Sequence, residues 1–357
     1  MKGRTKMLIH KFGSGKARAS AVAAIALSIA LVATGCSTDG STDGSTDGAG
    51  SNDANLAITF LPKNLGNPYF EASDAGGADA IAEFGGTYAE VGPVEATPDG
   101  QVSYINTLTQ QGVGAIVVSA NDPTAIGDAL NEARDAGVKV VTFDSDTDVE
   151  FRDVFVNQAD PEGIAKVQVA MISEQIGDAG EIAILSASAN ATNQNAWIEL
   201  MKTDLAANHP DITLVETVYG DDDDQTSFDK TAALLQSHPN LKGIVSPTTV
   251  GIAAAARYLS TSEYKGAVAL TGLGTPNQMR DYITDGTVTS FALWNPTDLG
   301  YLASYAAKAL IEGTITGAEG DTFEAGRLGS YTVAADGVVF LGDPFEFNAD
   351  NIGDFNY

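Results

Sequence analysis

One short segment, residues 61–70, gathers side chains that can bind the hydroxyl groups and the carbon face of a sugar. Lys63 and Asn67 supply an ammonium group and an amide, and Tyr69 and Phe70 supply two aromatic rings. Aromatic faces pack on the C–H face of a sugar, while ammonium and amide groups bond to its hydroxyls. The alternative is that Asn67 only caps a helix and that the rings only pack in the core.

Two carboxylates, Asp144 and Asp146, directly follow the apolar run 139–143. An ionised carboxylate can accept two hydroxyl protons at once, and such charge-assisted hydrogen bonds are stronger than neutral ones. We therefore predict Asp144 first and Asp146 second as ligand-binding residues, the alternative for each being a loop carboxylate that caps the next segment. They are also the only obvious carboxylate pair that a glycosidase could use.

Further polar and aromatic candidates follow later apolar runs in the second half of the chain. They are Asn193, Gln194, Pro247, Thr249, Trp294 and Asn295. Neutral amides bond to hydroxyls without demanding a charge on the ligand. Loops are rich in such residues in any protein, so it is their recurrence after successive apolar runs that predicts one shared site.

The sequence lacks the groups that hydrolases and metalloenzymes use. A serine or cysteine nucleophile needs a basic partner, but His10 lies near the N-terminus, and His209 and His238 each precede a proline. The motifs HExxH, CxxC and GxxxxGK[ST] are absent. The acidic run 221–224 lacks the alternate spacing of a calcium loop, so we expect a solvated turn there. These observations predict no catalytic residue, no metal and no cofactor.

From residue 56 onward, short apolar runs alternate with alanine-rich amphipathic stretches, which is typical of strand–helix units in parallel sheets. The predicted strands are 56–61, 87–91, 115–119, 139–143, 154–157, 181–186, 213–219, 243–246, 267–271 and 288–293. Ten strands are many for one parallel sheet, so we predict an α/β fold of two doubly wound lobes divided near residues 157–161. Ligands of such sheets bind at the carboxyl ends of strands, where the candidate residues lie.

The N-terminal residues are typical of export and tethering rather than of a folded core. Six basic residues precede the apolar run 19–33, which is shorter than the roughly 20 residues needed to span a bilayer. The only cysteine, Cys36, then follows a glycine at the expected cleavage point. We predict a lipoprotein signal peptide over residues 1–35, lipidation of Cys36, and a lipid anchor and flexible linker over residues 36–55, which contain three Ser-Thr-Asp-Gly repeats.

The chain is strongly acidic, with a formal net charge of -28. Residues 1–35 hold six of the 19 Lys and Arg residues and none of the 47 Asp and Glu residues, so their removal would leave -34. Such a surface repels nucleic acid and anionic lipid. We therefore expect no nucleic-acid partner, and attachment to a membrane through the lipid anchor only.

Taken together, the motifs resemble those of the ribose class of periplasmic sugar-binding proteins of ABC importers, most closely the rhamnose-binding proteins. They are LPKNLGNPYF, TFDSDTD, NQNAW, SPTTVGIAAAARYL, TGLGTPNQM, FALWNPTDLGYLA and FNADNIGDFNY. The resemblance covers nearly all of residues 56–357. It implies a monomer outside the cytoplasm, lipid-anchored at the cell membrane or periplasmic, that delivers a monosaccharide to an ABC permease and its ATPase and performs no catalysis.

The same resemblance implies a periplasmic binding protein type I fold, in which two lobes joined by three crossings close over the ligand like a hinge. It places the crossings near residues 157–161, 293–296 and 324–328. The lobes expected from it are 56–157 plus 296–326 for the N-terminal lobe, and 158–295 plus 327–357 for the C-terminal lobe.

A sister branch of this family binds a furanose-derived autoinducer. Its pattern is matched at Lys63, Asp144, Gln194 and Pro247. However, Asn193 stands where that branch has an aspartate, and Thr249 stands where it has an alanine. The lost carboxylate and gained hydroxyl favour a neutral deoxyhexose such as rhamnose, whose methyl group would pack against Tyr69, Phe70 or Trp294.

Other functions of the same fold remain open from the sequence. They are a binding protein for the autoinducer or for another sugar such as ribose, and a sugar sensor that feeds no transporter. The related transcriptional repressors would need a helix-turn-helix ahead of the first strand, where the predicted tether lies instead.

Overall fold

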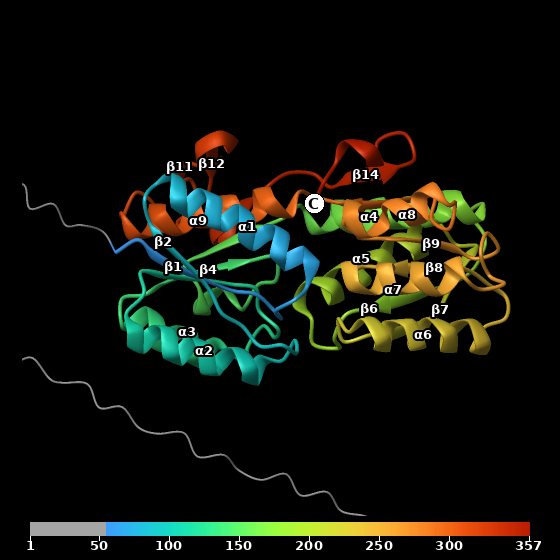
Figure 1. Ribbon diagram of the computed structural model, residues 1–357, viewed down its shortest axis with the longest axis horizontal. Helices are drawn as coiled ribbons and strands as arrows, with labels where there is room; N and C mark the ends of the chain where they lie inside the picture. Colours follow the sequence, from blue (N-terminus) through green and yellow to red (C-terminus); the bar gives the residue numbers. More distant parts are fainter. Residues whose placement is uncertain (1–54) are drawn as a thin grey trace, which may run out of the picture. The chain divides into compact units, whose positions relative to one another are not determined.

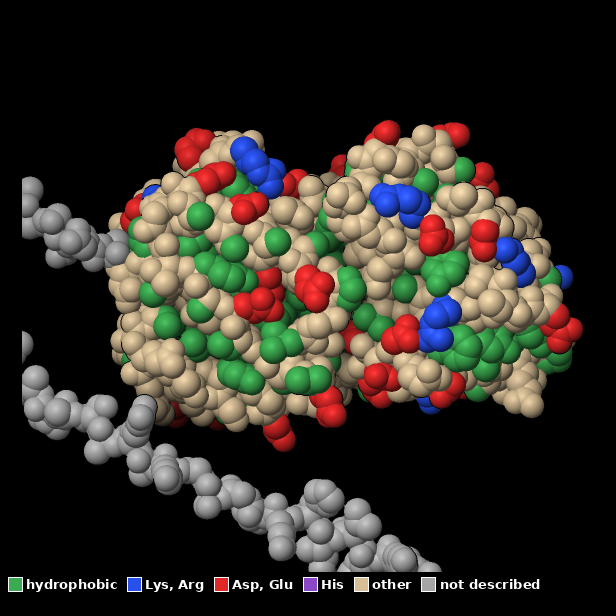
Figure 2. Space-filling view, viewed as in Figure 1, with side chains coloured by type: hydrophobic (Ala, Val, Ile, Leu, Met, Phe, Trp, Pro, Cys, Tyr) green, Lys and Arg blue, Asp and Glu red, His purple; other side chains and the backbone are tan. Residues whose placement is uncertain are grey.

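The computed structural model describes residues 55–357, which form two α/β lobes (Figure 1). The predicted signal peptide, Cys36 and the predicted linker up to residue 54 lie outside the described residues. Along the part of the chain that is described, no helix is long and apolar enough to cross a membrane. Figure 2 shows Asp and Glu side chains spread over both lobes of the viewed face rather than gathered in one patch.

The N-terminal lobe contains a six-stranded sheet in the order β13-β5-β4-β3-β1-β2, with all strands parallel. The strands are β1 (Ala57–Leu61), β2 (Thr87–Glu90), β3 (Ala115–Val118), β4 (Lys139–Phe143), β5 (Val154–Asn157) and β13 (Val338–Phe340). The central strands are continuous apolar runs because helices cover both faces of the sheet.

The helices of this lobe form one pair on each face of the sheet. Figure 1 shows α1 (Pro68–Glu83) and α9 (Pro296–Ile311) on one face, and α2 (Pro98–Gln111) and α3 (Gly127–Asp135) on the other. Glycines bring α1 and α9 close together: a Cβ atom at Gly300 would lie 1.8 Å from the Ser73 carbonyl oxygen. The hydroxyl of Ser304 then donates to the Gly77 carbonyl at 3.1 Å.

The C-terminal lobe contains a four-stranded parallel sheet in the order β7-β6-β8-β9. Its strands are β6 (Gly180–Ser186), β7 (Ile212–Tyr219), β8 (Leu241–Ser246) and β9 (Ala269–Gly272). Its helices are α4 (Pro161–Ile176), α5 (Thr192–Asn208), α6 (Asp224–Ser237), α7 (Thr249–Ser260) and α8 (Pro276–Thr284). Helices α4 and α5 pack together, as do α6 and α7 (Figure 1).

Beside this sheet, β10 (Ser290–Leu293) pairs antiparallel with β14 (Phe345–Asn348). A parallel bridge between Leu273 and Ala292 connects β10 to the end of β9. The C-terminal segment thus returns to the second lobe at β14.

The predicted fold class, two doubly wound parallel lobes, is confirmed, and β1 to β10 lie close to the ten expected strand positions. Short strands near the C-terminus were not expected: β11 (Thr322–Glu324) and β12 (Ser330–Thr332) form a hairpin, and β13 and β14 follow. Each has only three or four residues and no amphipathic helix after it, so the alternation of apolar runs does not mark it.

The third crossing differs from the expectation. Because β13 pairs with β5 in the N-terminal sheet, with Val339 opposite Val156, the chain is still in the first lobe at Phe340. It crosses between β13 and β14, not near residues 324–328, and the assignment of residues 327–340 to the C-terminal lobe is wrong. The other two changes of lobe lie between β5 and α4, and between β10 and α9.

The close approach of α1 and α9 gives a testable prediction for stability. We expect Gly300→Ala to lower the free energy of unfolding by about 1–3 kcal/mol, because the methyl group must push two packed helices apart. Gly163→Ala in α4 is the matched control, since its Cβ would meet only ordinary contact at 3.7 Å. Urea denaturation of both variants measures the difference, and equal stability of the two would refute the packing argument.

Candidate functional site

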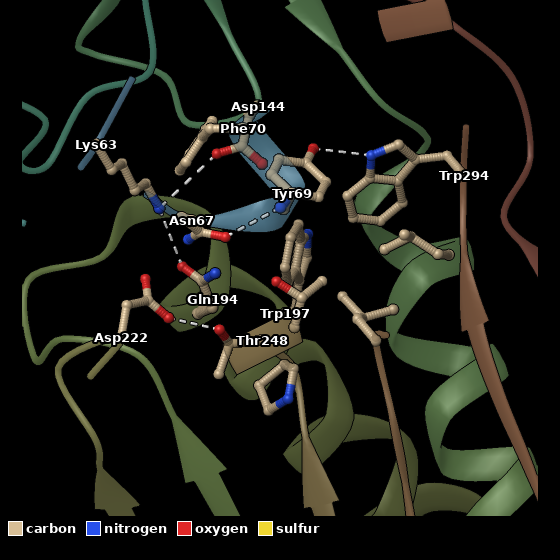
Figure 3. Close-up of a pocket in the computed structure, with 14 residues that line it drawn as sticks. Lys63, Asn67, Tyr69, Phe70, Asp144, Gln194, Trp197, Asp222, Thr248 and Trp294 are labelled. Atoms are coloured by element: carbon tan, nitrogen blue, oxygen red, sulfur yellow. Dashed lines mark hydrogen bonds and ion pairs between the residues drawn. The ribbon is translucent and has the colours of Figure 1, made fainter. Parts of the chain in front are cut away.

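A cavity lies between the two lobes, where the carboxyl ends of strands from both sheets converge (Figure 3). Its free volume is about 30 Å³, room for only one or two water molecules, so the side chains of the two lobes nearly close it in this form. The lining residues are Lys63, Asn67, Tyr69, Phe70, Asp144, Gln194, Trp197, Asp222, Pro247, Thr248, Thr249, Leu273, Leu293 and Trp294.

Lys63, just after β1, is a buried cation that lines this cavity, with 3% of its surface exposed. Its Nζ atom donates to Asn193 Oδ1 at 2.9 Å and to Gln194 Oε1 at 3.3 Å, both on the other lobe. The same atom lies 3.9 Å from Asp144 Oδ2. A buried charge is tolerated only when it is paired and hydrogen-bonded, so Lys63 ties polar groups of the two lobes together.

Asp144 directly follows β4 and has a left-handed backbone, with φ of 59°. The Ser119 hydroxyl donates to its Oδ2 atom at 2.7 Å, and Asn193 Nδ2 lies 3.4 Å from its Oδ1 atom. Burial raises the pKa of Asp144, while the Lys63 ammonium and hydrogen bonds from Ser119 and Tyr69 act against that rise. The carboxylate is therefore placed to accept hydroxyl protons inside the cavity.

Aromatic rings form an apolar wall of the cavity. Trp294 Nε1 donates to the Tyr69 hydroxyl at 2.9 Å, and the two rings meet edge to face with their centroids 6.2 Å apart. Phe70 packs edge to face on Tyr69, and Trp197 packs in the same way on Trp294. Burial and the nearby Asp144 carboxylate raise the pKa of Tyr69, so its hydroxyl keeps its proton. Tyr69 and Phe70 thus belong both to the core and to the cavity wall.

Asn67 likewise has two roles. Its Oδ1 atom accepts from the Tyr69 backbone N–H at 3.1 Å and so caps α1, while its side chain also lines the cavity. The cap orients the first turn of α1, which carries both aromatic rings of the wall. Asn67 is therefore a helix cap, as the alternative stated, and it also lines the cavity.

The second lobe presents its polar groups from the first turns of helices. Gln194 lies in the first turn of α5, and Pro247 and Thr249 lie where β8 passes into α7. Asn193 is buried and bonds to Lys63, but it is not among the residues that line the cavity. It therefore reaches the cavity through Lys63, whose ammonium group donates to its Oδ1 atom.

Two expected residues have other partners. Asp146 forms a bidentate ion pair with Arg152, with distances of 2.7 and 2.8 Å, and does not line the cavity. Asn295 caps α9 by accepting from the backbone N–H groups of Thr297 and Asp298. The left-handed backbone of Asp144 turns the chain directly after β4, and the Asp146 side chain pairs with Arg152 instead of entering the cavity.

The acidic run 221–224 corrects another expectation, that of a solvated turn. Asp221, Asp223 and Asp224 are exposed, but Asp222 is partly buried and lines the cavity. The Thr248 hydroxyl donates to Asp222 Oδ1 at 2.5 Å. Burial raises the pKa of Asp222, and the Lys63 ammonium and the Thr248 hydroxyl oppose that rise.

Signals for some of the missed lining residues are present in the sequence. Trp197 follows Gln194 by three positions, which places the two side chains on one face of α5. Asp222 comes shortly after β7 in the same way that Asp144 comes after β4. Leu273 and Leu293 carry no such signal, because apolar residues at strand ends look like core.

Between residues 55 and 357, no group of three or more His, Cys, Asp or Glu side chains is arranged to hold a metal ion. The chemistry offered by the cavity is one cation, two carboxylates, amides, hydroxyls and aromatic faces. This set can bind a polyhydroxylated ligand from both sides.

A model of the periplasmic binding protein domain family matches residues 58–315. The ribose import binding protein of Bacillus subtilis is 23% identical over 267 residues, which cover 73% of this chain and 84% of that protein. Among solved structures, a sugar ABC transporter protein from Actinomyces odontolyticus is 51% identical with a TM-score of 0.69, covering 86% of this chain and 99% of the other.

A second solved structure is an ABC transporter solute-binding protein from Clostridium phytofermentas with bound L-rhamnose. It is 41% identical with a TM-score of 0.81, and the match covers 83% of this chain and 97% of the other. With the family model spanning both lobes and these relatives matched over nearly their whole length, the chain belongs to the periplasmic binding protein family, as a solute-binding protein of the sugar ABC transporter type and not as an enzyme.

Proposed function

We propose that this protein captures a neutral monosaccharide, L-rhamnose, between its lobes and delivers it to an ABC permease with its ATPase. The observation that carries the proposal is the cavity itself, which is lined by polar groups from both lobes and by aromatic rings. The 41% identity to a protein with bound L-rhamnose supports the choice of sugar.

The apolar wall suits a 6-deoxy sugar. Rhamnose carries a methyl group where most hexoses carry a hydroxymethyl group. Tyr69 packs on both Phe70 and Trp294, and these three rings line the cavity together with Leu273 and Leu293. A methyl group removed from water against such a wall contributes roughly 0.8 kcal/mol, whereas a hydroxyl there would lack a partner.

Binding would be coupled to closure of the lobes. Asp144 and Lys63 come from one lobe, and Gln194 and Thr249 come from the other, so only the closed form can satisfy a ligand from both sides. A ligand with more contacts in the closed form shifts the population toward it. The closed pair of lobes is then the form that a permease would recognise.

The proposed location is outside the cell membrane, with Cys36 as the lipidated residue. Membership of a family of extracytoplasmic binding proteins agrees with the export signal in the sequence. A tether would hold the protein near its permease and raise the effective concentration there.

A furanose-type autoinducer is the second candidate ligand. A solved protein from Clostridium saccharobutylicum in complex with AI-2 is 28% identical with a TM-score of 0.80, covering 84% of this chain and 99% of the other. The cavity also has the lysine and the aspartate, Lys63 and Asp144, that the resemblance implies for that branch. Asn193 and Thr249 depart from its pattern, which favours rhamnose.

Isothermal titration calorimetry tests the choice of ligand. The described residues, 55–357, lie within one compact unit and can be purified for this purpose. Titrated with L-rhamnose, fucose, ribose, galactose and the autoinducer, the protein is expected to bind L-rhamnose most tightly. Heat from the autoinducer alone would reassign the ligand, and no heat from any of the five would overturn the proposal of sugar binding for this set.

Replacement of Asp144 tests its proposed role. We expect Asp144→Ala to weaken binding of L-rhamnose by at least about tenfold, because a hydrogen bond to a charged group contributes about 1.5–3 kcal/mol. Asp148→Ala, which removes an exposed carboxylate of the same loop, should leave the affinity unchanged. Equal affinities of the two variants would remove Asp144 from the site.

The raised pKa values of Asp144 and Asp222 predict opposite effects of pH on binding and on stability. Sugar affinity should fall on acidification, beginning at a higher pH than an ordinary aspartate would give, because protonation removes two acceptors. The folded protein binds these protons more tightly than the unfolded chain, so this contribution to stability is full at low pH and is lost as pH rises through the raised pKa.

Calorimetry and thermal unfolding over a pH series measure the two trends. The double variant Asp144→Asn with Asp222→Asn should flatten both relative to the unchanged protein. An affinity that stays constant down to the pH at which ordinary aspartates titrate would contradict the predicted raised pKa values.

A further inference from the structure

We propose that Asp222 is a sugar-binding carboxylate of the second lobe, that Thr248 positions it, and that it helps to select the hydroxyl pattern of the ligand. This inference rests on the proposed monosaccharide binding and deepens it. The argument starts from the place of Asp222 in the cavity rather than from the acidic run in which it occurs.

The two oxygens of the Asp222 carboxylate have different surroundings. Oδ1 accepts from the Thr248 hydroxyl at 2.5 Å, which fixes the orientation of the side chain. Among the residues that the structure describes, no hydrogen bond is found for Oδ2. Figure 3 shows this second oxygen directed toward Lys63 and Gln194. One oxygen of a held carboxylate is therefore presented to a ligand.

Asp222 repeats in the second lobe the arrangement of Asp144 in the first. Both aspartates follow a strand and have a left-handed backbone, with φ of 51° and 59°. Each accepts a hydrogen bond from a hydroxyl that follows another strand of its own sheet, Thr248 after β8 and Ser119 after β3. A left-handed backbone is uncommon outside glycine, and aspartate is one of the residues that adopt it more readily.

Thr248 gives a second reason to assign a role to this contact. It stands at the N-cap of α7, but its side chain makes no cap hydrogen bond to that helix. A threonine cap contributes about 1 kcal/mol to helix stability in typical cases. Here the hydroxyl binds Asp222 instead, so a local stabilising interaction is given up to orient the carboxylate.

The charges around Lys63 specify the ligand class. Asp144 and Asp222 lie on opposite lobes, and the ammonium of Lys63 lowers the pKa of each carboxyl against the effect of burial. One cation and two carboxylates leave an excess of acceptors. Hydroxyl donors of an uncharged polyol complement this set, whereas an acidic sugar would add a third negative charge.

The experiment compares three single variants by calorimetry with L-rhamnose. Asp222→Asn keeps the shape and removes the charge, and we expect about tenfold weaker binding or more. Thr248→Val removes only the positioning hydroxyl and should weaken binding less. Asp221→Asn is the matched control, because Asp221 is an exposed neighbour with the same left-handed backbone and does not line the sugar cavity.

Two further readouts separate a sugar contact from a structural role. Asp222→Asn should leave the thermal midpoint of the ligand-free protein unchanged or raised, since it removes a buried charge. In the double variant, Thr248→Val should add nothing to the loss caused by Asp222→Asn. The monodeoxy analogue of L-rhamnose that lacks the hydroxyl bound by Asp222 should bind equally to the unchanged protein and to Asp222→Asn. Measuring each analogue therefore identifies that hydroxyl.

The outcomes distinguish this inference from the proposed function. If the protein binds L-rhamnose and Asp222→Asn binds it equally well, only the role of Asp222 is overturned. If another sugar of the panel is the one bound, the same variants are measured with that sugar. If no sugar is bound, the proposed function fails and this inference fails with it.

Discussion

The site depends on the cost of burying one ammonium group. Lys63 is almost fully removed from water, and it is satisfied only by groups that come from both lobes, among them Asp144, Asn193 and Gln194. Breaking such a buried set by removing one partner leaves an uncompensated charge, which costs far more than a surface ion pair contributes. The lobes therefore meet where these groups can converge, and a bound hydroxyl can replace a protein partner only by providing the same hydrogen bond.

The fold supplies this convergence by a simple rule. Parallel strands end at one edge of each sheet, and the loops that follow β1, β4, β6, β7 and β8 carry the polar lining residues. The helices that begin in these loops hold the side chains at a defined angle, as Asn67 does when it caps α1. Aromatic packing between Tyr69, Trp294 and Trp197 completes the cavity, and it joins the first lobe, a crossing segment and the second lobe.

Affinity in such a cavity is obtained at the expense of stability. Burial raises the pKa of both Asp144 and Asp222, which means that each charged form is less favourable in the fold than in the unfolded chain. Both residues also have left-handed backbones. Groups with perturbed pKa values cluster at functional sites. A bound ligand can supply the stabilising hydrogen bonds that such a group lacks in the empty fold. Asp146, by contrast, has a bidentate partner in Arg152 and stabilises its own lobe.

The sequence by itself determined the ten main strands, the two lobes and the place of the cavity, because strand and helix periods and polar residues after strands are local patterns. It also identified Lys63 and Asp144 as candidates that the fold brings together. Only the tertiary structure decided that Asp222 rather than Asp146 lines the cavity, and that the third crossing follows β13. Both depend on where a side chain or a short strand finds its partner, Arg152 for Asp146 and β5 for β13. The partner of β13 is far away in the sequence. Arg152 is only six residues from Asp146, but which side chain it pairs with is decided by how the loop after β4 folds.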